Sequence, residues 1–172
     1  MHVFQHVPTR NEAKTQMVRI AICDDNDNDR AKAQELCTYY FDAKLQRPVE
    51  LTAYDNPVDM LAAIEKGIVF DLLLIDIYMP GLLGTEAVRE LRDNANDVPV
   101  IFLTTSLDHA YEAFGLRADG YLHKPFSIEQ FEQGLEPVVE NIDARRKAAI
   151  VIKTRDGVRR LDFDDFLYAE TL

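Results

Sequence analysis

Short apolar runs alternate with segments of helical periodicity along residues 18–142. A short, fully apolar run is typical of a buried parallel strand, and apolar residues repeating every three or four positions are typical of an amphipathic helix. Strand and helix patterns alternate in this way through the segment, which predicts an α/β fold with a parallel sheet and crossover helices. The five expected strands are residues 18–23, 49–54, 72–75, 100–103 and 120–122.

Capping residues and apolar stripes indicate where the helices begin and which faces they bury. Asp27 or Asn28 can cap the first helix. Asn56 and Pro57 fit the cap and the first position of the second helix. The pattern of the fourth helix places four apolar residues on one face and predicts that this face is buried. These residues are Leu107, Ala110, Tyr111 and Phe114.

Composition and charge narrow the possible functions. A chain of 172 residues can form one ordinary domain with a short additional element. Its net charge of -11 disfavours nucleic acid and anionic lipid as partners. Residues 144–160 hold 7 basic and 1 acidic residues, a net of 7 - 1 = +6, which favours a charged linker over a nucleic-acid-binding arm.

Cys23 and Cys37 have no metal-binding spacing and are expected to be reduced core residues. We expect a cytoplasmic protein without membrane contact, because no apolar segment approaches the roughly 18 residues that a membrane span needs.

Polar residues follow the expected strands at the points where the strands end. Asp24 and Asp25 follow the first strand, Asp76 the third, Thr104 the fourth and Lys124 the fifth. Ligands of open parallel sheets bind outside the carboxyl ends of the strands, so these side chains are expected to converge. Clustered carboxylates require a cation and suit Mg²⁺, and a neighbouring lysine suits a phosphate. The pattern predicts a site for Mg²⁺ and a phosphoryl group.

Four segments that contain these residues resemble the receiver domains of two-component response regulators, within the branch whose output is a LytTR-type DNA-binding domain. The resemblance covers about residues 18–145. It implies a flavodoxin-like (CheY-like) doubly wound sheet of five parallel strands in the order 2-1-3-4-5, with helices on both faces. The segments are IAICDD at 20–25, LLLIDIYMPG at 72–81, IFLT at 101–104 and GYLHKPF at 120–126.

The resemblance also implies a role for each residue of the expected Mg²⁺ site. Asp24, Asp25 and Asp76, with the backbone carbonyl of Tyr78, would hold Mg²⁺. Asp76 would take the phosphoryl group from the phosphohistidine of a sensor histidine kinase and become 4-aspartylphosphate. The protein would catalyse only its own phosphorylation and slow dephosphorylation, and phosphorylation would favour a homodimer that controls transcription.

The resemblance, together with position on the strands, also predicts what four further residues do. Thr104 would donate a hydrogen bond to the aspartyl phosphate, and Lys124 would bind it through the ammonium group. Thr104 and Tyr121 would form the conformational switch, although an ordinary half-buried strand tyrosine fits the sequence equally well. The Lys124-Pro125 peptide is expected to be cis. His123 should point to the face opposite Lys124 and is therefore a poor candidate for a catalytic base.

Three other functions could use a fold of this class. A haloacid-dehalogenase-like Mg²⁺ phosphatase needs an Asp-x-Asp nucleophile motif after the first strand, whereas Asp24 and Asp25 are adjacent. A flavodoxin-like electron carrier needs a phosphate cradle in the first loop, where these acids would repel the cofactor. A stand-alone receiver that acts through protein–protein interaction remains an alternative to transcriptional control.

The ends of the chain are expected to lie outside the receiver domain. Residues 1–16 are predicted to be a flexible leader, 17–147 the receiver, and 148–172 the start of a LytTR-type domain with a hairpin over 150–161. A complete output domain needs roughly a hundred residues. We therefore expect a truncated chain, competent in phosphorylation but without sequence-specific DNA binding. The alternative is that the hairpin packs on the receiver as an extra strand pair.

Overall fold

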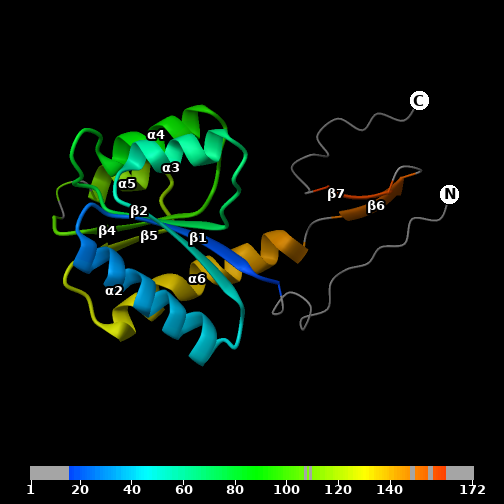
Figure 1. Cartoon of the computed structure of the whole chain (residues 1–172), viewed down its shortest axis with the longest axis horizontal. Coiled ribbons are helices and arrows are strands. Elements are labelled where there is room, and N and C mark those ends of the chain that lie inside the picture. The colour runs from blue at the N-terminus through cyan, green and yellow to red at the C-terminus, as the bar shows by residue number, and fades with distance from the viewer. Residues whose placement is uncertain (1–15, 107, 109, 148–149, 155–156, 162–172) are drawn as a thin grey trace. The chain divides into compact units, whose positions relative to one another are not determined.

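In the computed structural model, five parallel strands form one sheet in the order β2-β1-β3-β4-β5, as predicted (Figure 1). The strands are β1 (Val18–Cys23), β2 (Val49–Tyr54), β3 (Leu72–Ile75), β4 (Val100–Thr104) and β5 (Gly120–His123). The first three have the predicted limits, and β4 and β5 each extend one residue further. The structure describes residues 16–106, 108, 110–147, 150–154 and 157–161.

Helices cover both faces of the sheet. In Figure 1 α3, α4 and α5 lie on one face, and α2 and the first half of α6 lie on the other. The helices are α2 (Asp27–Thr38), which continues as the π-helix η1 (Tyr39–Lys44), α3 (Pro57–Glu65), α4 (Gly84–Asp93), α5 (Ala110–Gly115) and α6 (Ile128–Lys147). Residues 17–138 form one compact unit. No described helix is both long and apolar enough to cross a membrane.

The core lies on both sides of the central strands. Every residue of β3 is fully buried, as a parallel strand covered on both faces should be. Cys23 and Cys37 are buried free thiols, which confirms their prediction as reduced core residues. Burial, and secondarily the charge of Asp24, raises the pKa of the Cys23 thiol to about 12. Both cysteines therefore serve packing.

Two details of the helices differ from their sequence predictions. The side chain of Asn26, rather than Asp27 or Asn28, caps α2 and accepts hydrogen bonds from two backbone N–H groups of its first turn. On α5, Tyr111 and Phe114 are 91% and 82% exposed, so the predicted buried face is wrong. Ala113 of α5 and Leu116 just after it are buried instead, in the apolar cluster that also contains Phe102. Leu107 lies outside the described residues.

The residues after α6 include a separate antiparallel pair. The strands β6 (Ile150–Thr154) and β7 (Gly157–Leu161) pair from Ile150↔Leu161 to Thr154↔Gly157. This confirms the predicted hairpin, which forms a two-stranded sheet distinct from the five-stranded one. Residues 1–15 of the leader predicted over 1–16, and residues 162–172 of the predicted LytTR-type segment, lie outside the described residues.

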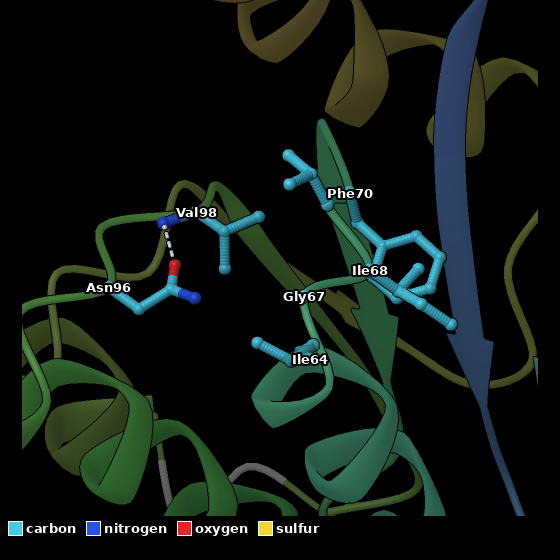
Figure 2. Close-up of a pocket in the computed structure, with 7 residues that line it drawn as sticks. Ile64, Gly67, Ile68, Phe70, Asn96 and Val98 are labelled. Atoms are coloured by element: carbon cyan, nitrogen blue, oxygen red, sulfur yellow. Dashed lines mark hydrogen bonds between the residues drawn. The ribbon is translucent and has the colours of Figure 1, made fainter.

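A small apolar hollow lies at the edge of the sheet where β3 and β4 begin (Figure 2). It has a volume of about 130 Å³. The backbone N–H of Val98 donates to the Asn96 side chain at its rim, at 3.1 Å. The polar residues singled out in the sequence follow the strands at the opposite edge, so this hollow is not part of the candidate site. Its lining comprises Ile64, Gly67, Ile68, Val69, Phe70, Asn96 and Val98.

Candidate functional site

Two neighbouring strands bring the three predicted aspartates together. β1 and β3 pair in parallel with Cys23 opposite Ile75, so the residues that follow them lie at the same level. The backbone N–H of Asp76 donates to the carbonyl of Cys23 at 2.9 Å and continues this pairing. Carboxylate oxygens of Asp24, Asp25 and Asp76 consequently all lie within 4.8 Å of one another. Asp24 and Asp76 are buried, and Asp25 is exposed.

Lys124 is the cation of this cluster, and it reaches the cluster from β5. Its backbone N–H donates to the carbonyl of Thr104 at 2.7 Å, and the Lys124-Pro125 peptide is cis, as expected. Its Nζ lies 2.6 Å from Asp24 Oδ2 and 3.1 Å from Asp76 Oδ2. His123, next to it on the strand, is exposed, whereas Lys124 is buried. The structure thus points Lys124 and His123 into different surroundings, as predicted.

The charges of the cluster depend on how deeply it is buried. Burial raises the pKa of the Asp24 carboxyl, although its hydrogen bond from Lys124 opposes this shift. Burial alone would lower the pKa of Lys124, but the hydrogen bond to Asp24 and the charge of Asp76 outweigh it, so the pKa is raised. The ammonium is therefore charged at neutral pH.

A divalent cation fits the donor set of this cluster. Asp24, Asp25 and Asp76 supply only carboxylate oxygens, which are the hard ligands that Mg²⁺ prefers. The Lys124 ammonium pairs with Asp24 and Asp76, and the Arg30 guanidinium donates to the backbone carbonyl of Asp24. Three carboxylates this close together are further stabilised by a bound cation.

Thr104 and Tyr121 both contact the backbone of Ser106, in the loop that follows β4. Thr104 is fully buried, and its hydroxyl accepts a hydrogen bond from the N–H of Ser106 at 3.4 Å. The hydroxyl of the half-buried Tyr121 donates to the carbonyl of Ser106. Burial, and next the neighbouring Tyr78, raises the pKa of Tyr121, which keeps its hydroxyl a donor. The two residues predicted as a switch are thus joined through one loop residue.

The comparison with known families agrees with this geometry. A sequence model of the response regulator receiver domain matches residues 20–136, more than half of the chain. The chain belongs to the response regulator receiver family. In the structure of the response regulator TrrA from Thermotoga maritima in complex with Mg²⁺-BeF, the match covers 71% of this chain and 99% of TrrA, with 26% identity and a TM-score of 0.60.

Two curated relatives of this receiver are named as regulatory proteins. The transcriptional regulatory protein NatR of Bacillus subtilis strain 168 is 25% identical over 155 residues, which cover 90% of this chain and 64% of NatR. The sensory transduction protein LytT of Oceanobacillus iheyensis is 30% identical over 78 residues, 44% of this chain and 32% of LytT. The chain spans less than two thirds of the length of either relative.

Two residues of the receiver site were not identified from the sequence. Asp29 of α2 contacts Lys124 Nζ at 3.0 Å. Gly84, the first residue of α4, packs so closely on Asp76 that a Cβ there would lie 2.1 Å from the Asp76 carbonyl oxygen. Helical periodicity indicates which face of its own helix a residue occupies. It does not indicate how close that residue lies to Lys124, 95 positions away in the sequence, so no pattern in the sequence assigned Asp29 to the site.

Gly84→Ala is expected to destabilise the receiver and displace the loop that carries Asp76. The added methyl group meets backbone rather than a movable side chain, so the loop has to shift, at a cost of about 1–3 kcal/mol in unfolding free energy. Urea unfolding of the variant measures this cost. Gly115→Ala is the matched control, because its Cβ would have nothing within 4 Å. Equal stability of the two variants would contradict the close approach.

Proposed function

We propose that this receiver accepts a phosphoryl group on Asp76 from a sensor histidine kinase and thereby controls transcription. The observation that carries the proposal is the convergence of three carboxylates within 4.8 Å, with the Lys124 ammonium 3.1 Å from Asp76 Oδ2. An Asp76 carboxylate oxygen attacks the phosphorus of the phosphohistidine. The oxygen–phosphorus bond forms, the phosphorus–nitrogen bond breaks, and the imidazole leaves with the electron pair.

The other residues of the site act on the charge and position of the phosphoryl group. Lys124 donates to a phosphoryl oxygen, and the Thr104 hydroxyl, which only accepts from the Ser106 N–H, donates its hydrogen to another. Asp24, Asp25 and Asp76, with the Tyr78 carbonyl, are proposed to hold Mg²⁺, which when bound offsets negative charge on the phosphoryl oxygens. The reaction occurs once per protein molecule, since Asp76 itself keeps the group.

Intact-mass measurement after incubation with acetyl phosphate and Mg²⁺ tests the proposal. The expected product carries one phosphoryl group, is stable in acid and labile in base, and does not form when EDTA is present. Beryllofluoride, a phosphoryl analogue, is expected to bind at Asp76 under the same conditions. Continuous release of phosphate in multiple turnovers would instead favour the Mg²⁺ phosphatase alternative, and a chain without any adduct would refute both.

The response to phosphorylation is proposed to be homodimerisation that alters transcription. The relative NatR is named a transcriptional regulatory protein, which supports this assignment. The relative LytT and the hairpin of β6 and β7 support the further proposal that residues 148–172 begin a LytTR-type output domain. Sedimentation with and without acetyl phosphate tests the dimer. An unchanged sedimentation coefficient would favour the stand-alone receiver that acts on another protein.

Tyr78→Ala is expected to shorten the lifetime of the phosphoryl group several-fold. The Tyr78 N–H donates to Asp76 Oδ1 at 3.3 Å, so the side chain begins beside the phosphorylated carboxylate and can screen it from water. The decay of the adduct after removal of acetyl phosphate gives the rate. Tyr111→Ala is the control, because Tyr111 lies on α5 and is 91% exposed. Equal decay rates in the two variants would contradict the screening role.

A further inference from the structure

Lys124 has a third partner that does not come from the ends of the strands. Its Nζ contacts Asp24 Oδ2 at 2.6 Å, Asp29 Oδ2 at 3.0 Å and Asp76 Oδ2 at 3.1 Å. Asp24 and Asp76 belong to the carboxylate cluster described above. Asp29 lies in the first turn of α2, outside that cluster. This extra ion pair requires its own explanation.

The three contacts use the full donor capacity of the ammonium group. A lysine side chain has three N–H donors and no acceptor. With one donor for each of Asp24, Asp29 and Asp76, no donor is left for a phosphoryl oxygen. An incoming phosphoryl group must therefore displace at least one carboxylate from Lys124.

Burial indicates which carboxylate can be released most easily. The Asp24 side chain is 2% exposed, and its second oxygen accepts from the Asn26 N–H at 2.9 Å, so it is fixed in place. The Asp29 side chain is 42% exposed. It lines an opening of about 380 Å³ together with Lys32, Thr105, Lys124, Pro125 and Phe126, so water can solvate its carboxylate after release. The cost of losing a partner is small for a group that water can reach.

We propose that Asp29 is a releasable counter-ion of Lys124, which holds the ammonium before phosphorylation and competes with the phosphoryl group for it. Asp29 is thus a positioning residue that acts through Lys124 and lowers the affinity of the site for a phosphoryl group. The inference rests on the proposed function, since it assigns a competitor to the same phosphoryl site. It goes beyond that function because it places the control of affinity in α2, outside the carboxylate cluster.

Beryllofluoride binding to the full chain at saturating Mg²⁺ tests this role. Asp29→Asn removes the competing charge and keeps the size of the side chain, and Asp29→Ala repeats the test without an amide. Asp27→Asn is the matched control. It removes the same charge from the same helical turn, but Asp27 pairs with Arg30 and its side chain is 90% exposed. Calorimetric titrations give the affinity for Mg²⁺ alone and then for beryllofluoride.

Both Asp29 variants are expected to bind beryllofluoride about two- to fivefold more tightly than Asp27→Asn, the range for a partly exposed ion pair. Their affinities for Mg²⁺ alone should match that of the control. Equal or weaker beryllofluoride binding would overturn the inference. An equal gain in Mg²⁺ and beryllofluoride affinity would also overturn it, because Asp29 would then act on the metal site and not through Lys124. If the wild-type chain binds no beryllofluoride, the proposed function itself fails.

Discussion

Asp76→Asn is expected to abolish the phosphoryl adduct formed with acetyl phosphate and Mg²⁺. The amide of asparagine is a far weaker nucleophile than a carboxylate, and it also removes one charge from the cluster with Asp24 and Asp25. We expect the adduct to fall below detection by intact-mass measurement. Any phosphorylation-dependent change in sedimentation should disappear with it.

Asp93→Asn provides the matched control for this loss. Asp93 is an exposed residue at the end of α4, away from the ends of β1 and β3. The control should form the adduct to the same extent as the wild-type chain. Thermal unfolding of both variants verifies that they are folded. An adduct of wild-type extent in Asp76→Asn would show that another residue is the phosphoryl acceptor.

Lys124→Ala is expected to permit some phosphorylation of Asp76 but to abolish the dimerisation that phosphorylation causes. The carboxylates of Asp24, Asp29 and Asp76 lose their shared cation, which should lower the unfolding free energy by about 1–3 kcal/mol when Mg²⁺ is absent. Mg²⁺ should recover part of this loss. Some adduct should still form on Asp76, but dimerisation should no longer respond to it, because the ammonium connects the phosphoryl group to β5 and its loop.

Lys32→Ala is the control for charge near the site. Lys32 lines the same opening as Lys124, but its Nζ pairs with Glu35 on the surface of α2. This variant should retain wild-type stability, adduct formation and dimerisation. Adduct formation and sedimentation measured on the same samples give both quantities. A dimer that still responds to phosphorylation in Lys124→Ala would contradict the proposed connection.

The sheet could be predicted from the sequence because each buried strand is visible as a short run of consecutive apolar residues. Leu72 to Ile75 is apolar throughout, and parallel pairing then places Asp76 level with Asp24 without further information. The contact between Asp29 and Lys124 depends instead on where the first turn of α2 lies relative to the residue that follows β5, which local periodicity does not encode. The exposure of Tyr111 and Phe114 likewise depends on which face α5 turns toward the core, where Ala113 is buried.

The two hydrogen bonds at Ser106 place little restriction on the side chain at this position. Both the bond to Thr104 and the bond from Tyr121 use the backbone N–H and C=O of Ser106. The Ser106 hydroxyl adds only a local contact, as acceptor from the N–H of Asp108. Most side chains at position 106 therefore leave the link between β4 and β5 intact. Proline is the exception, because it lacks the N–H that the Thr104 hydroxyl accepts from.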